Sequence, residues 1–452
     1  MKTKLLATAS AVVLGLASFA ATANDTIGYV PAAEWQIYSW HNWSYEFTDV
    51  ENNTAETSSD QESQKIRNNA ANLGFKASID TGLSTGGQAV KANFQCEQFM
   101  QFGGEFGGVG PAWCNRNSKI SISGAFGEVM WGNWLTPYNV VHAAWIDPYW
   151  DADFTSHTSL MGTINNFDYT GPGSGPSIGA GSVGANGFNK RQDSLVQYLS
   201  PNFNGFAFRV ATTTHDMGDE EVATATSGAT KLDPRLTEFG ATFNKPLANG
   251  DNFWMAVSYS MHDEWAAVDF NCDDSDDTGA RISAQYIHQW GGGGSTAIAA
   301  MYEELEYDWD DCGFMVDTDD DGMVDTLGAI STFVSTGTLG ATDLELGKDT
   351  WMVSLNHQFG NGWAVRGTYL DADEYDCGVS DGCDTDNDTD ASSISLGVDF
   401  TTSGGTMFAL KYVEVDNEDN SRYDTGFWAA GDGSLSAGSD SEVWGVSITQ
   451  AF

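Results

Sequence analysis

Apolar and polar side chains alternate along most of this chain in short segments. In one segment Leu73, Phe75 and Ile79 fall on one face. Lys76 and Asp80 fall on the other face. A period of two predicts β-strands with one apolar and one polar side. Sixteen such strands are expected, at residues 34–47, 71–80, 88–97, 117–125, 128–135, 193–200, 205–214, 236–246, 252–262, 279–290, 295–307, 349–359, 362–375, 392–402, 405–418 and 441–452.

The links between these segments fall into two alternating classes. After every second strand the link is short and mostly glycine-rich, as at residues 81–87, 291–294 and 360–361. The other links are long and polar, most clearly residues 136–192 and 308–348. Outer-membrane barrels have short periplasmic turns and long extracellular loops, whereas a β-sandwich has no reason for this asymmetry.

We therefore expect an all-β fold, a transmembrane antiparallel barrel of sixteen strands. An interior that wide cannot be filled by side chains. The apolar faces are accordingly expected to meet lipid, and the polar faces a water-filled lumen.

The N-terminus carries an export signal. Lys2 and Lys4 precede an apolar run at residues 5–20, and Ala21-Thr22-Ala23 forms a small-x-small cleavage site. This pattern predicts a signal peptide at residues 1–23 and a single barrel domain at residues 24–452. Past Ala23 the sequence has no apolar stretch of 18 residues, so a spanning helix is not expected.

The net charge of the chain argues against one class of partner, nucleic acid. Removing Lys2 and Lys4 leaves 17 basic residues (19 − 2) against 63 acidic ones, which is a mature net charge of −46 (17 − 63). Such an acidic chain is a poor partner for nucleic acid, which binds through phosphate contacts to basic groups.

Six cysteines in an exported chain predict disulfides. All six lie near the long-loop ends of the predicted strands, and the spacing contains no Cys-x-x-Cys or histidine-linked metal motif. Several pairings are formally open. The pairing we favour staples external loops by joining Cys96 to Cys114, Cys272 to Cys312 and Cys377 to Cys383.

One long link contains an acidic pattern typical of calcium loops. Carboxylates alternate before a glycine that permits a sharp turn. The candidate ligands are Asp317, Asp319, Asp321 and Asp325, with Gly322 at the turn. Gly328 stands where an EF-hand has its glutamate, so this is not an EF-hand, and a solvated acidic loop is the alternative. Residues 384–390 repeat the alternation without the glycine. No cofactor is otherwise expected.

Several segments resemble the general Gram-negative porin family. They are Asn72–Ser78, Ala89–Gln95, Ser123–Val129, Ser194–Tyr198 and Ser200–Phe206. The last strand, with Trp444, Val446 and Ile448 on one face and a terminal Phe452, resembles the signal read by the barrel-insertion machinery. The resemblance covers nearly the whole mature chain.

The resemblance implies a trimeric pore whose third loop folds into the lumen. Residues 136–192 would form that loop and would present Asp147, Asp151, Asp153 and Asp168. The family's basic wall would map onto Lys76, Lys91 and Lys119. Opposed charges across a constriction create a transverse field that favours polar solutes. Alternatively, the acids are solvated loop residues and the lysines ordinary lumen lining.

Together these features predict a passive outer-membrane channel for small hydrophilic solutes and ions, embedded in outer-membrane lipid and cation-preferring because of its charge. A substrate-specific channel is a second hypothesis. An outer-membrane enzyme such as a protease or phospholipase would need a catalytic group, but the seven histidines are scattered and no nucleophile motif is present. An adhesin or structural barrel would not conduct.

Overall fold

The structure is a computed structural model of the chain. It describes residues 33–52, 61–100, 113–146, 160–162, 187–189, 191–213, 222–223, 231–232, 235–264, 274–312, 314–316, 326–328, 342–377, 389–419, 421, 423, 425 and 438–452. No helix in these ranges is both long and apolar enough to cross a membrane.

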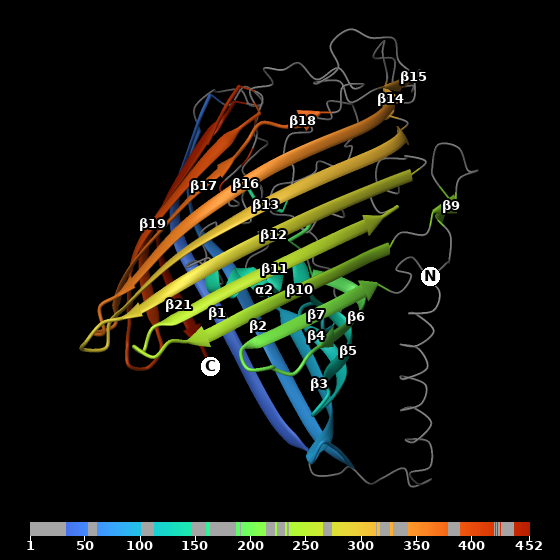
Figure 1. Ribbon diagram of the computed structural model, residues 1–452. Coiled ribbons are helices and arrows are strands. Elements are labelled where there is room, and N and C mark those ends of the chain that lie inside the picture. The colour runs from blue at the N-terminus through green and yellow to red at the C-terminus, as the bar shows by residue number, and fades with distance from the viewer. Residues whose placement is uncertain are drawn as a thin grey trace.

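The described residues form one large antiparallel sheet with sixteen long strands (Figure 1). These strands are β1 (Glu34–Glu51), β2 (Gln61–Thr85), β3 (Gln88–Phe99), β4 (Ser118–Gly124), β5 (Gly127–Leu135), β6 (Arg191–Leu199), β7 (Phe206–Thr213), β10 (Arg235–Pro246), β11 (Asn252–Asp263), β12 (Asp274–Gln289), β13 (Ser295–Cys312), β16 (Thr342–Gln358), β17 (Trp363–Ala372), β19 (Ala391–Thr401), β20 (Met407–Asn417) and β21 (Asp440–Ala451). The two-residue strand β18 (Asp376–Cys377) pairs with β16. Two small hairpins complete the strands, β8 (Val222–Ala223) with β9 (Lys231–Leu232) and β14 (Phe314–Val316) with β15 (Thr326–Gly328).

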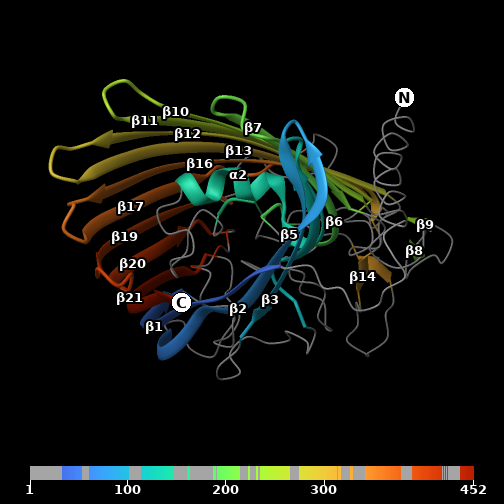
Figure 2. The ribbon, with the colours of Figure 1, turned by 90° about the horizontal axis from the view of Figure 1, so that it is seen from below.

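The sheet closes into a barrel because its first and last long strands pair. β1 and β21 run antiparallel from Trp40 opposite Ala451 to Glu51 opposite Asp440. Asn42 donates a side-chain hydrogen bond to Thr449 at 2.6 Å, across 407 positions of sequence. Seen from below, the sheet curves around the helix α2 (Pro137–Ile146), which lies inside the barrel (Figure 2).

The two faces of the sheet are reversed relative to a water-soluble barrel. Phe47 is 46% exposed and Val446 is 52% exposed on the outer side, whereas Glu46 and Ser44 on the inner side are buried. Apolar side chains thus face outward and polar side chains inward, as the alternation predicted and as a lipid-embedded barrel requires.

Each predicted segment overlaps one long strand, but several strands are longer than predicted. β2 begins at Gln61 instead of residue 71 and reaches Thr85, so the predicted link at 81–87 shrinks to Gly86–Gly87. A register shift between Asp80 and Ser84 allows β2 to continue. Residues 61–70 were missed because their side chains do not alternate clearly, although their backbone pairs with β1.

The short turns depend on local polar contacts and on glycine. Gly127, the first residue of β5 after the turn from β4, has a φ of +100°, and a Cβ there would meet Leu199 O at 2.1 Å. In the turn before β11, buried Asp251 accepts hydrogen bonds from Asn249 Nδ2 at 2.6 Å, from Gln289 N at 2.9 Å and from the Tyr286 hydroxyl. The Tyr286 and Gln289 hydrogen bonds hold the pKa of Asp251 well below its usual value.

Candidate functional site

The helix α2 begins the third long link and turns directly into the barrel. Thr136 precedes it and Pro137 is its first residue, where proline lacks an amide hydrogen that would be unpaired anyway. Tyr138 and His142 stand four positions apart and therefore share one face. That face contacts the inner side of β10, β11, β12 and β13.

The helix α2 contacts a buried ion pair on the inner wall of the barrel. Arg281 of β12 and Glu303 of β13 stand opposite each other in register, and both side chains are 0% exposed. Arg281 Nε donates to Glu303 Oε2 at 2.8 Å. The Tyr138 hydroxyl donates to the same oxygen at 2.8 Å, and the guanidinium carbon lies 4.4 Å from the centre of the Tyr138 ring.

Two further parts of the third link reach the same ion pair. The amide of Gly162 donates to Glu303 Oε1 at 2.5 Å. Arg281 Nη1 donates to Asn189 Oδ1 at 3.0 Å, and Asn189 Nδ2 donates to Met161 O at 2.7 Å. Residues near the beginning, middle and end of the 136–192 segment therefore meet at one charged pair.

Other buried contacts surround this pair. Glu238 Oε2 accepts the amide of Tyr138 at 2.6 Å. His142 lies 2.9 Å from the Ser258 hydroxyl through Nε2 and contacts Ser283 through Nδ1. The ammonium of Lys348 on β16 donates to Leu160 O. The described parts of the third link therefore lie against the inner wall of the barrel, and the course of the whole loop through the lumen stays a prediction.

Burial controls the chemistry of Tyr138. Loss of hydration, and next the negative charge of Glu303, raise the pKa of the Tyr138 phenol well above its usual value. The phenol therefore stays protonated, and able to donate to Glu303, over a wider pH range than a free tyrosine.

The three lysines predicted for the basic wall lie on the inner face of β2, β3 and β4. Lys76 is exposed, and its ammonium lies 4.6 Å from the centre of the Tyr38 ring. Lys91 lies 3.7 Å from Glu34, and Lys119 lies 2.6 Å from Glu128. Arg209 of β7 also interacts electrostatically with Glu128. Pairing with acids therefore partly neutralises this wall.

The acidic half of the predicted constriction lies outside the described residues. This applies to Asp147, Asp151, Asp153 and Asp168. The opposition of acids and lysines across the lumen therefore stays a prediction. The calcium candidates Asp317, Asp319, Asp321 and Asp325, and the segment 384–388, also lie outside the described residues.

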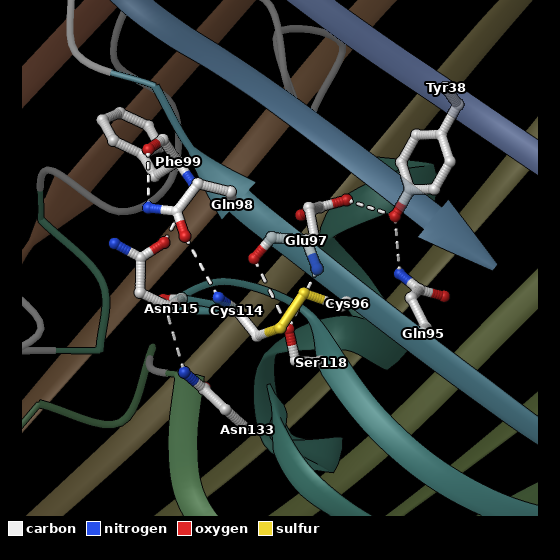
Figure 3. Close-up of a disulfide and its surroundings, with 10 residues drawn as sticks. All are labelled: Tyr38, Gln95, Cys96, Glu97, Gln98, Phe99, Cys114, Asn115, Ser118 and Asn133. Carbon is white, nitrogen blue, oxygen red and sulfur yellow. Dashed lines mark hydrogen bonds between the residues drawn. A yellow bond between two sulfur atoms is a disulfide. The ribbon is translucent and has the colours of Figure 1, made fainter. Parts of the chain in front are cut away.

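One predicted disulfide is confirmed. Cys96 of β3 is bonded to Cys114, with 4.8 Å between their Cα atoms (Figure 3). Cys114 N donates to Gln98 Oε1 at 3.0 Å, which fixes the returning chain against β3. Glu97 beside it accepts the Tyr38 hydroxyl at 2.8 Å and pairs with Arg116.

The remaining cysteine pairings stay predictions. Cys312 ends β13 and Cys377 ends β18, but their side chains are outside the described part of the chain, as are Cys272 and Cys383 altogether.

The predicted insertion signal lies on the outer face of β21. Trp444, Val446 and Ile448 are all exposed there. Phe452 is 77% exposed, and its backbone amide and carbonyl form hydrogen bonds with Ser39 of β1 at 2.8 and 3.2 Å. The last residue is thus held at the seam that closes the barrel.

Alternation did not identify Arg281, Glu303, Glu238 or Lys348 as site residues. Each occupies an ordinary inward position of its strand. Aligning β12 with β13 would have placed Arg281 opposite Glu303, and that register is the one signal that could have found the pair.

Comparison with known proteins identifies the family to which this barrel belongs. Residues 7–420 match the family profile described as Gram-negative porin. The fold is similar to an anion-selective porin from Comamonas acidovorans, with a TM-score of 0.62 and 18% identity over 93% of this chain and 100% of that one. It is also similar to OmpT of Vibrio cholerae, with a TM-score of 0.51 and 12% identity over 94% of this chain and 100% of that one.

OmpF of Salmonella typhi, in complex with daunomycin, gives a TM-score of 0.51 and 14% identity over 92% of this chain and 97% of that one. None of the curated proteins matches this chain. At these identities the solved structures show the fold, and the family profile shows the relationship. This chain belongs to the Gram-negative porins, which are passive channels of the outer membrane.

Proposed function

We propose that the chain forms a homotrimeric diffusion pore for small hydrophilic solutes and ions, with a preference for cations. The observation that carries this proposal is the closed barrel with a polar inner face, an apolar outer face and a helix folded inside. Such a wall supplies hydrogen-bonding groups to hydrated solutes along its whole length.

Cation preference is supported by the balance of charge. The mature chain carries a net charge of −46, counted after removal of Lys2 and Lys4 from the full sequence. On the inner wall, Lys91 and Lys119 stand beside Glu34 and Glu128, which weakens their attraction for anions. An acidic surface around the mouths would raise the local concentration of cations.

Anion preference is the competing candidate, and a specific observation favours it. Lys76 is exposed on the inner face, and Arg209 adds a second positive charge to the same region. The similar porin from Comamonas acidovorans is anion-selective. The acids Asp147, Asp151, Asp153 and Asp168 would have to outweigh this wall at the constriction.

The deciding experiment is a reversal-potential measurement in planar bilayers. Purified mature protein is inserted between two potassium chloride solutions of different concentration, with and without calcium. We expect openings in groups of three and a reversal potential of the sign set by potassium permeation. A potential of the opposite sign contradicts cation preference, and a silent bilayer from folded protein contradicts the pore itself.

The proposal includes the processing and assembly of the chain. Cleavage after Ala23 would remove the signal peptide, and the intact mass of protein from the outer membrane tests that position. Native mass spectrometry in detergent tests the trimer, and a monomer alone would contradict it.

A further inference from the structure

We propose that Glu303, together with Arg281, is the positioning residue that sets the width and steadiness of the pore. Four residues of the third link reach this pair or its immediate partners: Tyr138, Met161, Gly162 and Asn189. We call the described parts of that link, residues 137–146, 160–162 and 187–189, the inner segment. This inference rests on the diffusion pore proposed above.

Glu303 has the geometry of a hub, because both of its carboxylate oxygens are used. Oε2 accepts Arg281 and the Tyr138 hydroxyl, and Oε1 accepts the Gly162 amide. A neutral glutamine has only one acceptor oxygen and adds an NH₂ donor. Glu303→Gln therefore loses at least one of these contacts and leaves the fully buried Arg281 without its paired counter-charge.

The contacts of Glu303 hold the inner segment in place, whereas the closure of the barrel does not depend on them. The backbone pairing of β12 with β13 continues on both sides of Arg281 and Glu303, from Thr278 opposite Glu306 to Gln289 opposite Ser295. Loss of one side-chain contact leaves this ladder intact. What changes is the force that holds the inner segment against the wall, so the segment moves toward the path of the ions.

The chain offers a matched control for this substitution. Asp399 of β19 pairs with Arg366 of β17, with 2.6 Å between Oδ2 and Nε, and its side chain is 4% exposed. Its hydrogen-bonded partner belongs to the barrel wall and not to the inner segment. Asp399→Asn therefore removes a comparable charge from the lumen wall without touching the hub.

The test compares open-channel current noise and the voltage at which the current falls. We expect Glu303→Gln to raise the noise at least threefold and to lower that voltage, whereas Asp399→Asn resembles the parent. Tyr138→Phe, which removes only one donor to Glu303, should fall between them. The inference is overturned if Glu303→Gln and Asp399→Asn change both quantities equally, or if neither changes them.

A covalent tether separates positioning from a general loss of structure. A Cβ added at Gly240 of β10 would lie 2.8 Å from Val141 Cγ1 on α2. This is close to the about 3 Å between a sulfur and the partner's Cβ across a disulfide. The double substitution Val141→Cys/Gly240→Cys should therefore fasten the inner segment independently of Glu303.

In the Glu303→Gln background, the oxidised tether should return noise and threshold voltage to the values of the parent carrying the same tether. Reduction should restore the disturbed behaviour. If oxidation forms the bond and the current stays disturbed, Glu303 does not act by positioning. A silent parent contradicts the proposed pore, whereas a conducting parent with an unaltered Glu303→Gln contradicts only this inference.

Discussion

The disulfide between Cys96 and Cys114 should contribute measurably to the stability of the barrel. The perturbation is Cys96→Ser/Cys114→Ser, made in a chain whose other four cysteines are already serine so that no other pairing interferes. The bond closes a loop with a sequence separation of 18. Loop-closure entropy for that length corresponds to about 3 kcal/mol at room temperature. We expect the free energy of unfolding to fall by about this amount.

The assay is urea-induced unfolding in lipid bilayers, followed by the fluorescence of the 16 tryptophans. Gln98→Ala is the control, because it removes the acceptor of Cys114 N but keeps the bond. Gln98 Nε2 also donates to Phe99 O, so the control loses two hydrogen bonds and should cost about 2 kcal/mol. If removing the disulfide costs no more than this control, the loop-closure reasoning is wrong.

Four further predictions follow from sites described above. The pKa of Asp251 is depressed in the fold, so its stabilisation is complete above its unfolded pKa of about 4 and is lost as the pH falls below it. The difference in unfolding free energy between the parent and Asp251→Asn should therefore be larger at pH 7 than at pH 2, and equal differences would contradict this assignment. Deleting Phe452 should lower the yield of folded barrel in the outer membrane several-fold, measured by heat-modifiable gel mobility, because its contacts with β1 are lost. Lys76→Glu should shift the reversal potential toward stronger cation preference, and an unchanged potential would place Lys76 away from the ion path. Asp321→Asn should weaken calcium binding at least tenfold by calorimetry if the acidic loop is a site, and a parent that binds no calcium would remove that hypothesis.

The alternation of side chains predicted the strands well where one face meets lipid. Leu396 and Val398 of β19 are exposed on the outer side, and the intervening Gly397 and flanking Ser395 mark the inner side. The period is weak at the strand ends, where both faces are polar. Residues 61–70 of β2, where Ile66 is the one large apolar residue, were missed for that reason, and their backbone pairing with β1 extends the strand. Residues 342–348 of β16 were missed although Leu344 and Leu346 alternate with Asp343 and Glu345, and their backbone pairs with β13.

The candidate site was only partly predictable. The inward turn of the third link and the inner-face lysines were expected from the family resemblance, and Cys96 with Cys114 from their positions near one loop. The buried pair of Arg281 and Glu303 was not predicted. A charged residue that faces the water of the lumen and one that holds a loop segment both occupy inward-facing positions of a strand, so the alternation does not distinguish them. Only three-dimensional packing separates these roles.

The seam between β1 and β21 also governs how the chain can fold. Asn42 and Thr449, which are 407 positions apart, must come together for β1 to pair with β21. Until they do, the sheet keeps two free edges. Such high contact order makes folding slow, and until the end of the chain arrives both terminal strands expose unpaired backbone groups that invite aggregation. The unfolded chain must therefore be kept soluble in the periplasm until its last residues are available, and truncation near Phe452 should produce aggregates instead of smaller pores.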